Sequence, residues 1–374
     1  MESSILETLQ SRPVIFTVLC TLFGLAYKLL LNDPWHGIPQ VGKSPSFFSF
    51  RATEANGDFF RNGKALLDQG YARYKESMFL VHTSDLPRVV LSQRYLAELR
   101  SLPETMLSHR ESVCDRFLGY WTGLDAVRQS TLHNEICQTT LVQNLPSLVP
   151  SMHEEAVAAI RDNISLNSSI SSTPFDTYGS IFNMIARINS RILVGLPLCR
   201  DPDWLQVAEG YPQDSVAVAM DLRPYFPWLR WAIYPFLDSA RRLKNEYAIA
   251  HRKLEPLIDE RRNVAAARHQ GEERKDVLQW MLDLGTGNDR KKDVIVGKMM
   301  FLTMAGFHAP TATAVHVVYD LCAHPNYLAP LRKEIEDELA IEGGVWTLAL
   351  LRRLKRLDSV IKESQRINSP GLRK

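Results

Sequence analysis

The stretch Met304-Ala-Gly-Phe-His-Ala-Pro-Thr-Ala-Thr313 stands in the middle of an apolar run of helical period that extends from Asp293 to Cys322. At 1.5 Å per residue this run forms about 45 Å of helix, which is longer than the helices of ordinary globular proteins. A helix this long and this apolar must cross the core of a domain. The sequence therefore predicts a mainly helical domain whose core this helix crosses.

The middle of this helix carries an interruption. Pro310 has no N–H to donate to the carbonyl of Gly306, so we expect the hydrogen-bond ladder to open or kink there. Gly306 has no side chain and lets another group approach the backbone closely. His308 and Thr311 are polar groups beside the opening. Two interpretations stay open at this point, a site for chemistry or a proline-kinked core helix whose histidine is satisfied by its neighbours.

Histidine and cysteine spacings do not predict a metal site built from these residues. His308 and His316 lie eight positions apart, and no partner stands at the i+4 spacing that suits one metal. The cysteines show neither a C-x-x-C spacing nor a pairing pattern, which favours a reducing compartment over a disulfide framework. They are Cys20, Cys114, Cys137, Cys199 and Cys322.

A second helical run ends close to the last residue of the chain. Between Leu354 and Arg366 the pattern is helical, and Glu363 and Arg366 are three positions apart on one face. This spacing predicts an ion pair. Many surface helices carry such a pair for a few tenths of a kcal/mol, so the pair alone indicates no function.

The rest of the pattern is helical apart from one predicted hairpin. Residues 78–82 and 88–91 form short apolar runs separated by Ser84-Asp-Leu-Pro87, which is typical of two paired strands. Helical period returns in four further segments and dominates the chain. These segments are 152–164, 181–194, 240–262 and 275–284. We predict a mainly α (α+β) fold with a small β lobe near its start.

The first 34 residues are predicted to form a membrane anchor and the linker that follows it. Residues 13–31 are apolar except for two threonines and Lys28, and their length matches the hydrocarbon core of a bilayer. The acidic start and the lack of a small-x-small cleavage site argue against a cleaved signal peptide. Basic residues follow the span, which places the domain 35–374 in the cytosol.

The charge balance excludes one class of partner. The 374 residues carry 44 basic and 42 acidic side chains, a net charge of +2. A groove for nucleic acid would show as a strongly basic stripe, so we expect no nucleic-acid partner.

Three stretches, in this order, resemble the cytochrome P-450 monooxygenases. They are Ala305-Gly306-x-His308, Tyr319-Asp-Leu-Cys-Ala-His-Pro325-x-Tyr327-x-x-x-Leu331-Arg-Lys-Glu-Ile335 and Leu357-Asp-Ser-Val-Ile-Lys-Glu363-Ser-x-Arg366. Ala186-Arg-Ile-x-Ser-Arg-Ile-x-Val-Gly-Leu-Pro-Leu-Cys-Arg200 is similar to a segment of the membrane-anchored fungal members that oxidise terpenoids and related secondary metabolites. The resemblance covers most of the chain after residue 34.

This resemblance implies a haem enzyme that inserts one oxygen atom of O2 into a hydrophobic small molecule. The iron would be held by a cysteine thiolate, and electrons would come from NADPH through cytochrome P-450 reductase at the endoplasmic reticulum membrane. It further implies an oxygen-binding groove at Gly306 and a proton relay through His308, with Ala309 where a threonine is usual, so that Thr311 or the substrate would complete the relay. The Glu363 and Arg366 pair would be structural.

The resemblance also implies a propionate contact from His133, where the family usually has tryptophan, with Cys137 where arginine is expected. The family's Phe-Gly-x-x-x-Cys loop would lie beyond Lys374, which predicts a catalytic domain that is truncated before its metal ligand. The competing interpretation is a membrane-anchored relic without catalysis, or a fragment that binds a hydrophobic ligand or a partner. Ala309 and Cys137 favour it, since each lacks a group that the chemistry would use.

Overall fold

The computed structural model describes residues 21, 35, 37–43, 53–83, 86–164, 176–225, 227–267 and 274–368. Apart from Thr21, the predicted anchor at 13–31 lies outside these residues, and so does most of the linker that follows it. Within the described ranges no helix combines the length and the apolar character that a membrane crossing requires.

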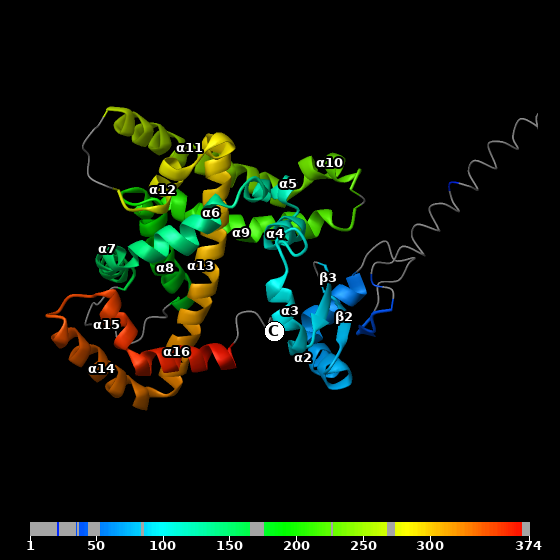
Figure 1. Ribbon diagram of the computed structural model, residues 1–374, viewed down its shortest axis with the longest axis horizontal. Helices are drawn as coiled ribbons and strands as arrows, with labels where there is room; N and C mark the ends of the chain where they lie inside the picture. Colours follow the sequence, from blue (N-terminus) through cyan, green and yellow to red (C-terminus); the bar gives the residue numbers. More distant parts are fainter. Residues whose placement is uncertain are drawn as a thin grey trace, which may run out of the picture.

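The chain forms a small three-stranded sheet and a large helical body, which lie at opposite ends of the described structure (Figure 1). The strands are β1 (Gln40–Val41), β2 (Met78–His82) and β3 (Pro87–Leu91). The helices are α2 (Thr53–Tyr74), α3 (Leu96–Ser101), α4 (His109–Phe117), α5 (Gly119–Thr122), α6 (Leu132–Glu135), α7 (Leu141–Asn163), α8 (Thr177–Leu193), α9 (Pro202–Leu222), α10 (Arg230–Ile233), α11 (Asp238–Ala267), α12 (Val277–Leu284), α13 (Lys292–Ala323), α14 (Leu328–Ile341), α15 (Leu348–Arg353) and α16 (Lys355–Ile367).

The β lobe is built on the predicted hairpin. Strands β2 and β3 pair antiparallel with Met78 opposite Leu91, and β1 adds to β2 in parallel. Helix α2 packs on this sheet so closely that a side chain at Gly70 would meet the ring of Phe79 at 2.2 Å. The lobe therefore has a small apolar cluster of its own, around Val41, Phe79 and Val81, separate from the core of the helical body.

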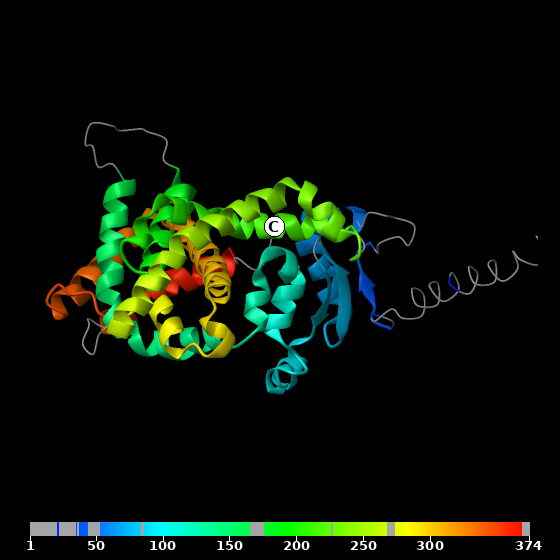
Figure 2. The same ribbon diagram turned by 90° about the horizontal axis from the view of Figure 1, so that it is seen from above.

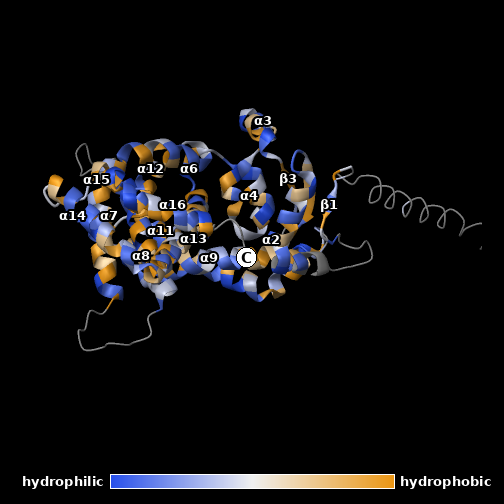
Figure 3. Cartoon of the chain, turned by 90° about the horizontal axis from the view of Figure 1, so that it is seen from below, coloured by the Kyte–Doolittle hydropathy of each residue, from blue (hydrophilic) through white to orange (hydrophobic). Residues whose placement is uncertain are grey.

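Helix α13 is the central element of the helical body, as the long apolar run predicts. It packs against α8, α9, α11 and α16, and Figure 2 views it nearly end-on among the helices of the body. Every residue from Val294 to Phe301 is buried, so this part of α13 has protein on all sides. Around it, apolar and polar residues alternate along the other helices (Figure 3), which is the pattern of helices that bury one face.

Helix α8 is fixed beside α13 by ionic and polar contacts. The carboxylate of Glu155 on α7 is 1% exposed and accepts from the guanidinium groups of Arg187 and Arg200, with N to O distances of 2.7 Å in both ion pairs. The indole of Trp204 on α9 donates to the hydroxyl of Ser190 at 3.0 Å. Buried charges are stable only when they are paired and hydrogen-bonded, so this network fixes the position of α8.

The predicted helices are confirmed, with shifts of their ends. The predicted segment 152–164 lies within the longer α7, which follows α6 through a π-helical turn at Ile136–Thr140. Helix α9 lies outside the segments named from the sequence pattern, and it contains Gly210 and Pro212, two residue types that disfavour helix. In the structure the helix continues through both residues, and Gly210 leaves room for the Glu246 carboxylate of α11, which a side chain at 210 would meet at 2.1 Å.

Candidate functional site

The candidate site is the middle of α13, where one face of the helix leaves the core. Ala305, Ala309 and Pro310 are exposed, whereas Phe307 and Thr311 are buried in the helical body. Residues four positions apart share a helix face, so Ala305 and Ala309 form a narrow surface of small side chains. A Cβ atom built at Gly306 would have no atom within 4 Å. This part of α13 therefore has open space beside a wall that carries no bulky group.

Pro310 leaves the Gly306 carbonyl without a donor from its own helix, as expected, yet α13 continues through the proline without a break. The missing donor comes from α8, because the side-chain amide nitrogen of Asn189 lies 2.8 Å from the carbonyl oxygen of Gly306. The sequence reasoning missed Asn189, since the two residues are 117 positions apart. The segment that resembles the fungal proteins gave no signal either, because it leaves position 189 open.

The two polar residues of the site point in different directions. His308 is half-buried and packs against α8, with its ring centroid 5.4 Å from that of Phe182. Thr311 is fully buried, and its hydroxyl donates to the carbonyl of Phe307 at 2.8 Å. The hydroxyl of Thr311 is therefore on the opposite side of α13 from Ala309, and its hydrogen bond is made within the same helix. His308 remains beside the turn from Gly306 to Pro310, which we call the opened turn because its backbone hydrogen bond is missing. The part of His308 in proton transfer stays a prediction.

His133 lies one helix away, in α6, and is completely buried. Its ring meets the ring of Phe301 on α13 edge-on, with centroids 5.4 Å apart, and neither ring nitrogen has a hydrogen-bond partner. Burial, reinforced by the positive charge of Lys298, lowers the pKa of His133 to about 4. The imidazole is therefore neutral at physiological pH and carries one N–H for which the described residues supply no acceptor.

Glu363 and Arg366 form the expected pair on α16. Two hydrogen bonds of 2.7 Å and 2.8 Å join the guanidinium to the carboxylate, and this contact lowers the pKa of Glu363. Both side chains are more than half exposed. Helix α16 itself packs on the second half of α13, where Gln365 donates to the hydroxyl of Thr313 at 3.5 Å. The pair thus stands at the surface of the body, and its described hydrogen bonds are those between its two members.

Comparison with known proteins decides the family. The family model for cytochrome P-450 matches residues 72–373, which include α13, α16 and every residue of the candidate site. The chain belongs to the cytochrome P-450 family.

Fungal relatives of this cytochrome P-450 cover the same region. A cytochrome P-450 monooxygenase of Emericella nidulans is 34% identical over 84% of this chain and 59% of its own length. The ent-kaurene oxidase of Gibberella intermedia is 31% identical over 83% of this chain and 57% of its own. The chain thus spans about three fifths of the length of these relatives.

A solved structure supports the fold of this cytochrome P-450. The retinoic acid bound cyanobacterial CYP120A1 superposes with a TM-score of 0.60 at 14% identity, over 88% of this chain and 69% of that one. At this identity the likeness concerns the fold alone. It agrees with the mainly helical body and small sheet that the sequence predicts.

The described residues fit one side of the haem that this family implies. The surface of Ala305 and Ala309 and the open space at Gly306 suit a flat macrocycle, and the unpaired N–H of His133 suits a carboxylate. None of the four described cysteines suits the iron. Burial raises the pKa of Cys114 and of Cys199 to about 11 and also raises that of Cys137, whereas a thiolate ligand requires a lowered pKa; Cys322 is an exposed residue near the end of α13.

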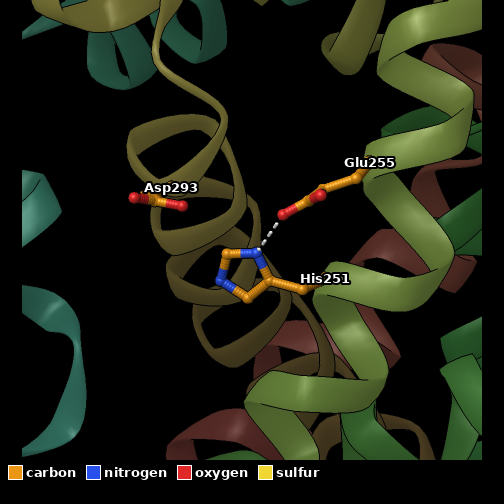
Figure 4. Close-up of side chains that lie close together, drawn as sticks. All are labelled: His251, Glu255 and Asp293. Atoms are coloured by element: carbon orange, nitrogen blue, oxygen red, sulfur yellow. Dashed lines mark hydrogen bonds and ion pairs between the residues drawn. The ribbon is translucent and has the colours of Figure 1, made fainter.

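A second group of metal-ligating side chains lies where α11 meets the start of α13. His251, Glu255 and Asp293 each offer one atom within 4.8 Å of the others, and Figure 4 shows Glu255 and Asp293 on either side of the imidazole. The bond of 2.7 Å between His251 and Glu255 is an ordinary i,i+4 pair, and Asp293 complements the dipole at the start of α13. The local roles of these three residues account for their positions.

Proposed function

We propose that this protein is a haem-dependent monooxygenase that oxidises a hydrophobic small molecule, a terpenoid or another fungal secondary metabolite. The observation that carries the proposal is the small-residue face at Ala305 and Ala309, which borders open space in a chain that the family model matches over residues 72–373. Relatives named as ent-kaurene oxidases support this substrate class, since ent-kaurene is a hydrocarbon without polar groups.

When bound, haem supplies the oxygen chemistry of this family. The residues of this chain would position it and keep water out. Ala305 and Ala309 present methyl groups that leave room for a flat ring, and Gly306 lets that ring approach the backbone. His133 would donate its N–H to a propionate. A neutral imidazole suits this role, because an acceptor at that point satisfies a donor that is otherwise buried and unpaired.

His308 is the group that we propose for proton transfer. An imidazole exchanges protons near neutral pH, and this one lies beside the opened turn. Ala309 has no hydroxyl, and the hydroxyl of Thr311 donates to Phe307. A relay through this chain would therefore pass through His308 and ordered water or a polar group of the substrate.

We further propose that the protein is held at the endoplasmic reticulum membrane by residues 13–31, with the helical body in the cytosol. The apolar span in the sequence supports this proposal. The same location suits electron delivery from NADPH through cytochrome P-450 reductase. Fractionation of cells that produce the full chain and a form lacking residues 1–34 tests it, since both forms in the soluble fraction would refute an anchor.

A pyridine haemochrome assay and a carbon-monoxide difference spectrum test the central proposal. We expect the protein to bind one haem and to form a complex with carbon monoxide. Addition of ent-kaurene should then shift the haem spectrum, whereas a polar polyol of similar size should not. The alternative function, a non-catalytic protein that binds a hydrophobic ligand, is favoured by the missing hydroxyl at Ala309. A well-folded product without haem would establish that alternative and refute the monooxygenase.

A further inference from the structure

The opened turn of α13 depends on a neighbouring helix. A helical carbonyl normally accepts from the N–H four positions later, and at Gly306 that position is Pro310. The side-chain amide of Asn189 occupies the place of the missing donor, at 2.8 Å from the Gly306 oxygen. The contact joins the wall of the candidate site to α8.

Asn189 is held in place by the residues on either side of it. The next residue, Ser190, is fully buried and accepts from the indole of Trp204. Two positions earlier, Arg187 is 6% exposed at its side chain and is paired with Glu155 and Asp162. Because both contacts fix α8, the amide of Asn189 reaches the Gly306 carbonyl from a rigid support rather than from a loop.

The side chains of the turn itself do not serve this carbonyl. Ala309 has no polar atom, and Thr311 donates to Phe307 instead. His308 turns toward Phe182 on α8. The described side-chain donor to the Gly306 carbonyl is therefore Asn189.

We propose that Asn189 is a positioning residue that holds the opened turn of α13 in the geometry of the site. Its effect on catalysis rests on the proposed function, whereas its effect on the turn does not. Asn189 lies within the segment Ala186–Arg200 that resembles the fungal proteins, at a position that the resemblance leaves open. This proposal gives that segment a part in the site, through a side chain that faces α13 rather than the reacting molecule.

A double-mutant cycle tests the contact without haem. In Asn189→Ala the Gly306 carbonyl loses its donor, and we expect amide hydrogen exchange in residues 305–311 to become about tenfold faster. Pro310→Ala restores a backbone N–H at position 310, which can donate within the helix. In that background Asn189→Ala should change exchange less than twofold. Equal effects in the two backgrounds would overturn the proposal.

Two further variants control the cycle. Asn183→Ala removes a side-chain amide of α8 whose oxygen accepts from Asn163 of α7 at 3.0 Å. This substitution should leave exchange in residues 305–311 unchanged. Asn189→Asp keeps the size of the side chain but supplies an acceptor in place of the donor, so it should match or exceed the effect of Asn189→Ala. A protected turn in Asn189→Asp would also overturn the proposal.

The haem-loaded protein tests the catalytic consequence. Asn189→Ala should change the spin state in the visible spectrum and lower the amount of product formed per NADPH consumed, and Pro310→Ala should reverse part of both changes. Unchanged spectra and coupling, together with a positive exchange cycle, would refute the positioning role at the haem. Absence of haem from every variant would instead refute the proposed function, and the exchange cycle would still report on the contact.

Discussion

The buried imidazole of His133 predicts a loss of stability in mild acid. Its pKa is lowered to about 4 by burial and by Lys298 and Arg110, against a weaker opposite effect of Asp289 and Glu135. The unfolded chain takes up a proton at this position as pH falls through about 6.5, whereas the folded chain does not. Stability is therefore complete above pH 6.5 and is lost progressively as the pH falls toward 4.

The size of this loss follows from the two pKa values. Between pH 7.5 and pH 5 a histidine with values of about 6.5 unfolded and about 4 folded costs about 2 kcal/mol of stability. With about 2.1 cal/mol/K of unfolding entropy per residue, a chain of 374 residues loses about 2 to 3 °C in its unfolding midpoint. His133→Phe removes the titrating group and keeps a ring beside Phe301.

Thermal unfolding followed by circular dichroism at the two pH values measures this effect. The difference between the two midpoints should be about 2 to 3 °C smaller in His133→Phe than in the unmodified protein. His109→Gln is the matched control, since it replaces an exposed histidine on α4 in place of a buried one. An undiminished pH difference in His133→Phe would show that another group causes the loss of stability. The assignment of His133 as a neutral, buried imidazole would then be wrong.

Three further outcomes are expected. Glu155→Gln should lower the free energy of unfolding by about 3 to 5 kcal/mol in denaturant titrations, because Arg187 loses its buried counter-charge and keeps only the exposed Asp162; a loss below about 1 kcal/mol would contradict a buried network. Glu246→Gln should raise the unfolding midpoint at pH 8 but not at pH 4.5. Burial raises the pKa of Glu246 to about 8, so above its ordinary pKa of 4.5 the ionisation of this carboxyl opposes folding. Equal shifts at both pH values would exclude titration as the cause. Glu363→Gln should leave the midpoint of this chain unchanged, since the pair is exposed, and a clear loss would reveal a contact beyond Arg366.

Local patterns in the sequence predicted the elements of the fold. The hairpin follows from two short apolar runs around a turn, and α13 follows from about 30 residues of apolar period. The pair of Glu363 and Arg366 follows from i,i+3 spacing within one helix. Each of these features depends on residues that are close together in the chain, where helix and strand geometry fixes the distances.

Features that depend on tertiary packing could not be predicted in the same way. The donor to Gly306 comes from Asn189, and no local rule connects residues so far apart. The rotation of α13 decides that Thr311 faces the core while Ala309 faces out, and this rotation is set by the helices that pack around it. Helix α9 likewise continues through Pro212, where tertiary packing overrides the low helix propensity of that residue.

The central position of α13 also determines when this protein can fold during its synthesis. The helices that pack against it on both sides, α8 and α16, begin at Thr177 and Lys355, so its partners are made both before and after it. A ribosome synthesises the chain from its N-terminus at about 5 to 20 residues per second. The apolar faces of the earlier helices therefore stay exposed for several seconds before α13 is made. Nascent chains should therefore depend on chaperones that shield such faces until translation has passed α13.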